Sequence, residues 1–427
     1  MPALAAAPAG ARMKILYLNF DRGIPVLGDK GASVHVREFM RAAGELEQEV
    51  LLACARTGSG NAAPTGEILE LPLEGAADGG TMKLARDDAQ SDEIRRIAQE
   101  LSKLVYDGEV SERLLTELAS RAYRPDLVYE RHALFSTAGV KIALRLGRPR
   151  ILEVNAPLAE EQKRFRGLSL ESVARRMEVE SFRGADAIVA VSDEVRDYVH
   201  SVSGVSFERI HVLPNGVDVR RFACEDTGEA LRKRLGYRSG DCAIAFVGSF
   251  KPWHGTSFLL EVFAGLAPVR PEARLIAIGD GPERASLCAR VADCDFRDRV
   301  CLPGRVPHAQ IPSWVAAADI MVAPYEAIDG FYFSPLKVLE ALAGGKPVVA
   351  PRLGQLGRLI EHGKTGLLYP PGDAAACREA IRTLIDDPAR RRAMGVAARA
   401  AAAGRSWQAV VRRVLEIAAS APARSAA

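Results

Sequence analysis

Short runs of apolar residues alternate with longer segments of mixed polarity along most of this chain. From residue 13, MKILYLNF predicts a buried strand, VHVREFMRAAGEL a helix, and QEVLLACA the next strand. Further short apolar runs at 126–132, 150–157 and 187–192 are each followed by loop or helix signals. Strands and helices that alternate in this way are typical of a parallel sheet with helices on both faces.

The alternation stops at VLPNGVD (212–218), where Pro, Asn and Gly fall together, and it resumes at CAIAFVGSF. A chain of 427 residues is also longer than one hydrophobic core usually serves. We therefore predict an N-terminal domain over 13–213 and a C-terminal domain over 214–404. The first 12 residues, MPALAAAPAGAR, lack the features of a signal peptide and are expected to be a disordered leader.

Composition and charge narrow the functional classes. The 57 basic and 54 acidic residues nearly balance, so nucleic acid is not expected as a partner. Seven cysteines without CxxC pairs or histidines at ligand spacing indicate the reduced thiols of a cytoplasmic protein. The sequence contains no run of eighteen apolar residues, so we expect no membrane span. The basic region over 160–183 would be attracted to a membrane surface, and peripheral contact with the inner membrane face therefore stays an alternative.

One helix start stands out, in FYFSPLKVLEALAGGKPVVAP (331–351). Ser334 is a suitable N-cap and Pro335 a suitable first helical residue, so we predict a helix over about 335–343 that stops at a Gly-Gly pair. The free N–H groups and the positive dipole end of such a start favour a phosphate.

Two charged residues follow on the first turns of this predicted helix. Lys337 adds positive charge at the end that suits a phosphate. Glu340 lies one turn further along the same side, where a carboxylate suits the hydroxyl groups of a ribose. A capped amphipathic helix with a solvated Lys and Glu would explain the same residues without any ligand.

Two glycine loops strengthen the ligand-binding interpretation. GSFKPWHG (248–255) places Lys251 and two glycines after the first strand of the second domain, and GDKGAS (28–33) places Gly31 before a helix of the first domain. Glycine lets a backbone approach a diphosphate closely. Neither loop contains G-x-G-x-x-G, and GDGPER (279–284) departs from it at Arg284, so a dehydrogenase is disfavoured.

Two other segments only imitate ligand sites. GRLIEHGKT (357–365) has one residue too many for a phosphate-binding P-loop and is expected between a helix and a strand, the reverse of the required order. DCD (293–295) has no third metal ligand near it in the sequence. We interpret both as solvated turns and expect no metal.

In their order, these segments resemble the retaining glycosyltransferases of family 4. The resemblance spans nearly all of 13–420 and includes DKGASVHVREF, ILEVNAPLAEE, VLPNGVD, FVGSFKPWHG, LPGRVPH and SPLKVLEALAGGKPVVAP. It implies the GT-B fold, an α/β architecture of two Rossmann-like doubly wound domains facing a central cleft. It also implies a hexosyltransferase-like enzyme of polysaccharide biosynthesis that moves a sugar from a nucleotide-diphosphate sugar to a glycan, lipid-linked or small-molecule acceptor without a cofactor.

The resemblance also assigns roles to particular residues. Glu340 would be the second glutamate of the E-x7-E motif and bind the donor ribose, while Lys251 and Lys337 would neutralise the diphosphate. Gly31 would line the donor site, and residues 405–420 would form the helix that returns to the first domain. The other donor-contacting residues would be Gly248, Ser249, Arg305, Val306, Tyr332, Ser334, Pro335 and Leu336, with Arg305 to Pro307 flanking the nucleobase.

Several positions depart from the family pattern. Tyr332 replaces the first glutamate of E-x7-E, so Asp329 or loop backbone groups would have to contact the sugar. Ser249 and His254 stand where arginine and lysine are usual. Asn155, which we place among the catalytic residues, replaces a common histidine, and its amide can hydrogen-bond a sugar hydroxyl but cannot act as a base.

Two histidines and two rival functions remain open at this point. His35 and His132 lie near loops expected to face the cleft, although a lone histidine is more often structural. A nucleotide-sugar epimerase would share the phosphate-binding features but needs acid and base groups beside the sugar. A catalytically silent sugar-nucleotide binder would fit the changes at Tyr332 and Asn155.

Overall fold

The computed structural model describes residues 12–60, 65–73, 91–223, 225–327 and 330–421. The chain forms two compact units: unit 1 is Met1–Pro214 with Val410–Ala427, and unit 2 is Asn215–Ala409. The predicted boundary lies after residue 213, and the observed division follows Pro214. Apart from Arg12, the expected leader lies outside the described residues, as do Cys224 and Asp329.

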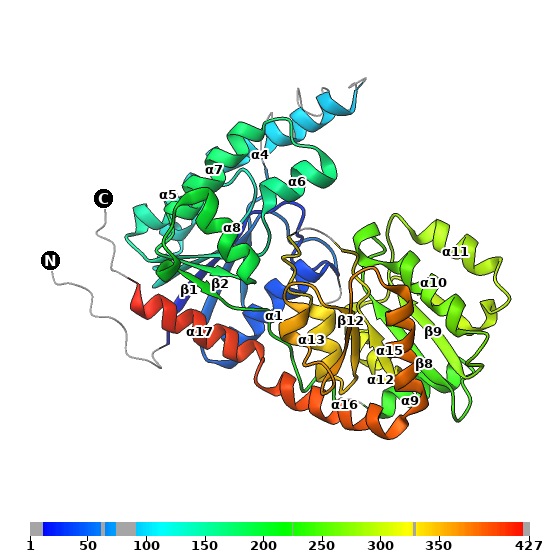
Figure 1. Ribbon diagram of the computed structural model, residues 1–427. Helices are drawn as coiled ribbons and strands as arrows, with labels where there is room; N and C mark the ends of the chain where they lie inside the picture. The colour runs from blue at the N-terminus through cyan, green and yellow to red at the C-terminus, as the bar shows by residue number, and fades with distance from the viewer. Residues whose placement is uncertain (1–11, 61–64, 74–90, 224, 328–329, 422–427) are drawn as a thin grey trace. The chain divides into compact units, whose positions relative to one another are not determined.

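Unit 1 is built on a seven-stranded parallel sheet with the order β3-β2-β1-β4-β5-β6-β7 (Figure 1). Its strands are β1 (Lys14–Asn19), β2 (Glu49–Cys54), β3 (Glu67–Glu70), β4 (Leu127–Arg131), β5 (Arg150–Val154), β6 (Ala187–Ala190) and β7 (Ile210–Val212). The order runs outward in both directions from β1 and β4. This places a topological switch point, where ligands bind in such sheets, at the carboxyl ends of these two strands.

Buried carboxylates of one long helix hold the starts of two other helices in unit 1. The helices are α1 (Gly31–Glu45), α4 (Asp92–Ser120), α5 (Ala138–Leu146), α6 (Leu158–Arg166), α7 (Glu171–Arg183), α8 (Asp193–Ser203) and most of α17 (Trp407–Ser420). Asp107 of α4 accepts hydrogen bonds from the backbone N–H groups of Thr137 and Ala138, both at 2.8 Å. Glu100 accepts from Ser169 at 3.0 Å and Leu170 at 2.7 Å. These acids therefore replace the missing caps of α5 and α7.

Unit 2 contains a six-stranded parallel sheet with the order β10-β9-β8-β11-β12-β13. Its strands are β8 (Cys242–Val247), β9 (Ala273–Ile278), β10 (Val300–Gly304), β11 (Ile320–Val322), β12 (Val348–Pro351) and β13 (Gly366–Tyr369). Its helices are α9 (Glu225–Arg234), α10 (Thr256–Leu266), α11 (Arg284–Ala292), α12 (Ile311–Ala317), α13 (Leu336–Ala343), α14 (Leu356–Leu359), α15 (Ala374–Asp386) and α16 (Pro388–Ala403). The switch point of this sheet lies between β8 and β11.

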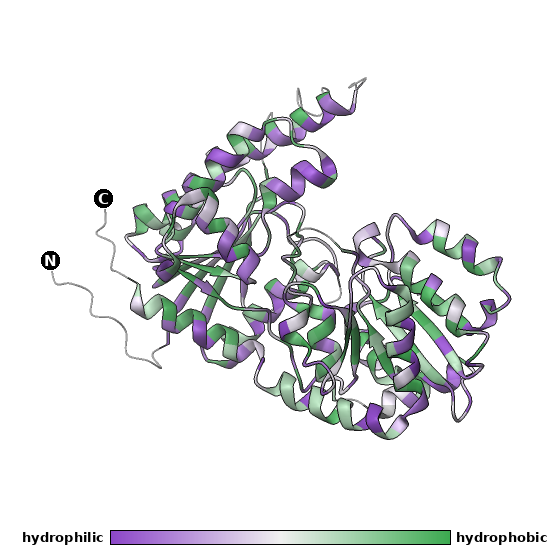
Figure 2. Ribbon diagram, in the orientation of Figure 1, coloured by the Kyte–Doolittle hydropathy of each residue, from purple (hydrophilic) through white to green (hydrophobic). Residues whose placement is uncertain are grey.

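Helices cover both faces of the unit 2 sheet, as the apolar pattern predicts. One buried cluster joins the strands to α12, α13 and α16, and a second joins them to α10, α11 and α15. Figure 2 shows the strands largely in the green of apolar residues, while the helices carry both colours. Such two-sided burial fits the nearly unbroken apolar runs that identified these strands.

The strand and helix predictions failed where elements are short or polar. β3 and β7 have only four and three residues, and their segments carried no strand prediction. Residues 225–234 form α9, although no helix was predicted between VLPNGVD and CAIAFVGSF. Short edge strands bury few side chains, so they leave a weak hydrophobic pattern.

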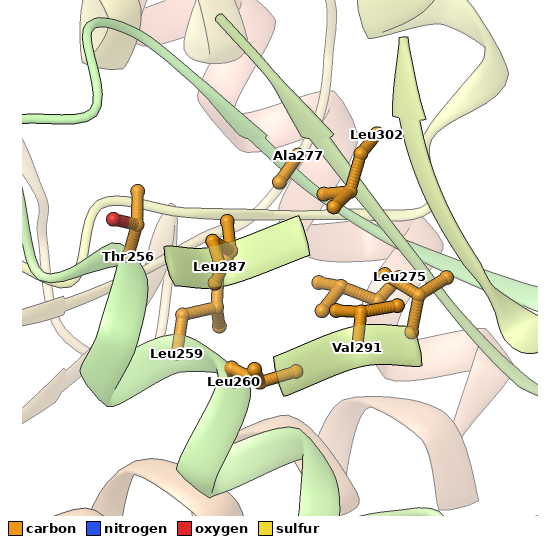
Figure 3. Close-up of a pocket in the computed structure, with 9 residues that line it drawn as sticks. Thr256, Leu259, Leu260, Leu275, Ala277, Leu287, Val291 and Leu302 are labelled. Atoms are coloured by element: carbon orange, nitrogen blue, oxygen red, sulfur yellow. The ribbon is translucent and has the colours of Figure 1, made fainter. Parts of the chain in front are cut away.

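A small cavity lies beneath α10 and α11 in unit 2 (Figure 3). Its volume is about 10 Å³, near the minimum for one water molecule. Leucine, valine and alanine side chains line it, and the hydroxyl of Thr256, the one polar lining side chain, donates to Glu283 at 2.7 Å. The cavity is a packing gap and has no room for a substrate.

Among the described residues, no helix combines the length and apolarity needed to cross a bilayer.

Candidate functional site

Loops at the carboxyl ends of β8, β10 and β11 bring several predicted residues together in unit 2. The loop after β8 carries Gly248, and a Cβ atom there would lie 2.5 Å from the Lys337 Nζ on α13. The loop after β10 leads to His308, whose Nε2 lies 2.7 Å from the Glu340 Oε1. Residues far apart in sequence thus meet at the switch point of this sheet.

Glycines also allow the loop after β9 to pack closely against the loop after β8. Gly248 has φ +153°, and a Cβ atom added at Gly279 would lie 1.8 Å from the Gly248 carbonyl oxygen. A Cβ atom at Gly281 would lie 2.7 Å from the Phe250 carbonyl oxygen. The glycines of GDGPER therefore serve backbone packing against GSFKPWHG, which explains a glycine-rich turn without a dinucleotide site.

Lys337 occupies an unusual place for a lysine. Its Nζ is shielded from solvent and has no hydrogen-bond partner among the described residues. The amine lies 4.4 Å from the centre of the Phe246 ring and 4.8 Å from that of Tyr325. Burial lowers the pKa of Lys337 to about 7, against a smaller opposite effect of Glu340. An anion at this point would supply the hydrogen-bond acceptor that the amine lacks.

Glu340 is buried on the second turn of α13, with 8% of its surface exposed. Its Oε1 accepts a hydrogen bond from the Nε2 of His308, the first residue of a 3-10 turn, His308–Gln310. The solvated Lys and Glu of the ligand-free interpretation are therefore not observed. Sequence reasoning missed His308, and its place directly after Arg305-Val306-Pro307 was the one available signal.

The loop after β8 contains a histidine that carries no charge at neutral pH. His254 lies within 2.5 Å of the Ser249 carbonyl oxygen and 3.1 Å of its hydroxyl. Burial, with the charge of Lys337 as a second cause, lowers the pKa of His254 to about 2. His254 therefore adds no positive charge beside Lys337. The amine of Lys251, in the same loop, lies 4.8 Å from the ring centre of Trp253.

The start of α13 differs from the prediction by one residue. Pro335 is the N-cap and makes no side-chain cap, while the helix begins at Leu336. Ser334 is therefore not the N-cap, because its hydroxyl instead accepts a hydrogen bond from the Asn215 N–H at 3.1 Å. The Asn215 amide also donates to the Ser334 carbonyl at 2.6 Å, which ties Asn215 to the loop before α13 within unit 2.

The remaining predicted residues of unit 2 lie around the same loops. Tyr332 is buried, with its ring 4.3 Å from that of Phe333. Arg305 is exposed, and Val306 packs against the core cluster that includes α13. Tyr332 cannot reproduce the charge of the glutamate that it replaces, because its side chain is a phenol.

Gly31 and Asn155 belong to unit 1. Gly31 is the first residue of α1, and Asn155 directly follows β5. Glu153 lies two residues before Asn155. Burial alone would raise the pKa of the Glu153 carboxyl group, but contacts with His35, Arg131 and Asn155 together hold this pKa below its usual value. Asn155 therefore adjoins a buried charged cluster at the carboxyl end of the sheet.

The two histidines that we considered are held in buried contacts of unit 1. His35 Nε2 lies 2.7 Å from the Glu153 Oε1, and Arg131 donates to its Nδ1 at 3.3 Å. Because arginine can only donate, Nδ1 accepts and Nε2 carries the proton. His132 contacts Glu178 at 3.3 Å, and the Tyr198 hydroxyl donates to the same carboxylate at 2.5 Å. These contacts favour structural roles for both histidines.

Two family models match consecutive parts of this chain. Residues 30–221 match Glycosyltransferase Family 4, and residues 228–401 match Glycosyl transferases group 1. A D-inositol 3-phosphate glycosyltransferase from Pseudarthrobacter chlorophenolicus is 32% identical, across 69% of this chain and 70% of the relative. An alpha-D-kanosaminyltransferase from Streptomyces kanamyceticus is 29% identical, across 52% of this chain and 57% of the length of that relative. The structure of HepE from Anabaena with UDP and glucose aligns with a TM-score of 0.70 at 21% identity, covering 95% of this chain and 99% of that one.

Two doubly wound α/β units and these matches define a glycosyltransferase with the GT-B fold. The chain belongs to glycosyltransferase family 4. The predicted fold class and the predicted family are therefore confirmed.

Proposed function

We propose that this enzyme transfers a sugar, with retention of anomeric configuration, from a nucleotide-diphosphate sugar bound by unit 2. The observation that carries the proposal is the shielded amine of Lys337 beside Gly248. No described residue supplies this amine with a hydrogen-bond acceptor. Lys251 and the first N–H groups of α13 would add positive potential to the same anion. Glu340, one turn along α13, would accept hydrogen bonds from the ribose.

Stabilisation of the leaving diphosphate is the proposed source of catalysis. Negative charge grows on the diphosphate as the bond to the sugar breaks, so preorganised amines and N–H groups act most strongly in the transition state. Asn155 has no basic group, so it would orient a sugar hydroxyl without removing a proton. In this scheme the departing diphosphate itself takes the proton of the acceptor hydroxyl. No metal is required.

The relatives suggest which substrates to test first. HepE was solved with UDP and glucose, which makes UDP-sugars the first donors to examine. Relatives named D-inositol 3-phosphate glycosyltransferase make inositol phosphates the first acceptors, beside glycan and lipid-linked acceptors. We further propose that the enzyme works in the cytoplasm, with peripheral membrane contact where the acceptor is lipid-linked.

Purified enzyme incubated with UDP-, GDP- and ADP-sugars, with and without acceptors, tests this function. We expect a glycoside product with the anomeric configuration of the donor, observed by NMR, and slow donor hydrolysis without acceptor. An isomerised donor would instead identify an epimerase. Binding of the donor without any turnover would identify a silent binding protein, the alternative suggested by Tyr332 and Asn155 together.

A further inference from the structure

The hydrogen bond between His308 and Glu340 connects two elements that are separated by 32 positions in sequence. Both side chains are mostly buried, with 15% and 11% of their surfaces exposed. In such an environment a hydrogen bond to a carboxylate restricts its rotation more strongly than at the surface. The contact therefore gives the Glu340 carboxylate one preferred orientation.

The backbone around His308 is itself firmly placed. β10 ends at Gly304, whose φ is +80° and whose carbonyl accepts from the Gly279 N–H at 3.0 Å. The turn His308–Gln310 leads directly into α12, which buries Trp314 in the cluster that also holds Val338 and Leu339 of α13. His308 and Glu340 are thus anchored on elements that share one core.

The two oxygens of Glu340 have different surroundings. Oε1 is held by His308, whereas Oε2 accepts no hydrogen bond from any described residue. Lys337 does not compensate, because its amine lies near the rings of Phe246 and Tyr325 and hydrogen-bonds to no residue in the described part of the chain. One oxygen is therefore fixed by the protein, and the other remains an acceptor for a ligand hydroxyl.

We propose that His308 is a positioning residue, which orients the Glu340 carboxylate so that Oε2 accepts hydrogen bonds from the ribose hydroxyls of the nucleotide. The inference rests on the proposed role of Glu340 in ribose binding. Without His308, the carboxylate is free to rotate, and binding must then restrict it. His308 thereby contributes to the preference of the site for a ribose over a deoxyribose.

The test measures this preference directly, as the ratio of affinities for ribose and 2′,3′-dideoxyribose forms of a nucleoside diphosphate. Calorimetry with the uridine, adenosine, guanosine and cytidine diphosphates is applied to the full-length parent and to His308→Ala, His308→Gln and Glu340→Ala. Gln310→Ala, an exposed position in the same turn, is the matched control. Glutamine places an amide N–H near the position of Nε2, so it can restore the contact.

For the parent and Gln310→Ala, we expect the ribose form to bind about 10- to 100-fold more tightly, the range for one or two hydrogen bonds to a carboxylate. The ratio should fall to about threefold or less in His308→Ala, and His308→Gln should recover most of it. A merely structural histidine would change the melting temperature but leave the ratio unchanged.

The outcomes separate the inference from the function on which it rests. Loss of the ratio in Glu340→Ala together with an unchanged ratio in His308→Ala would overturn the inference alone. A full ratio in Glu340→Ala, or no binding of any of the four ribonucleotides to the parent, would overturn the proposed role of Glu340 and the inference with it.

Discussion

Lys337 and Glu340 lie three positions apart on one helix, yet the surroundings of their ionisable groups differ. Glu340 receives a hydrogen bond from His308, whereas the amine of Lys337 lies near two aromatic rings and has no acceptor among the residues that the structure describes. Shielding an amine without a partner lowers stability. Residues that lower stability in this manner are common at functional sites, where a ligand later completes their contacts.

Replacing Lys337 by Met tests this opposition between stability and function. Methionine fills similar space between the rings and removes the unpartnered amine, so the melting temperature of the ligand-free enzyme should rise by a few degrees, corresponding to about 1 kcal/mol. Turnover should fall at least tenfold, because the charge acts most in the transition state. Lys364→Met, at an exposed lysine paired with Glu361, is the control and should change neither quantity. A variant that is both less stable and fully active would contradict the assignment.

Glu340→Ala should weaken binding in the ground state. In the proposed function, hydrogen bonds from ribose to this carboxylate form before the reaction and persist during it, so nucleotide affinity should fall by about 1.5–3 kcal/mol. Glu361→Ala, at an exposed glutamate of the same unit, is the matched control. Calorimetry with the nucleoside diphosphate measures the change, and unaltered affinity would remove Glu340 from the site.

The pKa of Lys337, about 7, predicts how donor binding depends on pH. A bound diphosphate favours the charged amine, so affinity should decrease as the pH rises through about 7, with proton uptake on binding above it. The nearby His254 remains neutral over this range, since its pKa is about 2. An intact nucleotide sugar is the suitable ligand because its diphosphate does not titrate there. The pH dependence should disappear in Lys337→Met, and its persistence would assign it to another group.

The sequence pattern identified Lys337 and Glu340 but not their surroundings. Helical spacing places both residues on neighbouring turns, which is local information. The rings that shield Lys337 come from β8 and from the loop after β11, and His308 precedes Glu340 by 32 positions. Contacts of this kind depend on how the chain folds back, so no periodicity in the sequence reports them.

At the scale of elements, long helices and central strands were predictable, while ends and edges were not. α13 begins one residue later than predicted because the Ser334 hydroxyl binds the Asn215 backbone instead of capping the helix. β3 and β7 lie at the two edges of the unit 1 sheet, where few residues are buried. Propensity rules describe a segment alone, and tertiary hydrogen bonds override them at helix ends.

The carboxylates of α4 provide a stability prediction at this scale. Asp107→Ala leaves the N–H groups of Thr137 and Ala138 without their acceptor, so unit 1 should lose about 2–4 kcal/mol of stability. Glu112→Ala, at an exposed position of the same helix, should change stability by less than about 0.5 kcal/mol. Denaturant unfolding measures both effects, and equal effects would contradict the capping role.

At the scale of the whole molecule, the alternation of strands and helices predicted that each unit contains a sheet of parallel strands. Right-handed crossover connections leave few ways to arrange such a series. The chemistry of the reaction is less predictable because it depends on single residues: Tyr332, His254 and Asn155 each differ from the family pattern without altering the fold.

Catalysis should survive removal of metal ions. In the proposed function, Lys251 and Lys337 supply the positive charge beside the leaving diphosphate, so EDTA should leave turnover unchanged within about twofold. Asp293 ends α11 as its C-cap, and the part of the chain that the structure describes contains no cluster of three or more metal-ligating side chains. Activity that disappears with EDTA and returns with manganese or magnesium would refute the proposed scheme.

The two carboxylates of α4 that cap α5 and α7 also imply an order in which parts of unit 1 become stable. Asp107 and Glu100 reach helix starts that are about 30 and 70 positions further along the chain, so neither α5 nor α7 has its cap until α4 has docked. In hydrogen exchange, the amides of Ala138 and Leu170 should therefore open together with α4 as one cooperative segment. Docking of α4 thus determines when the first amides of α5 and α7 become protected from hydrogen exchange.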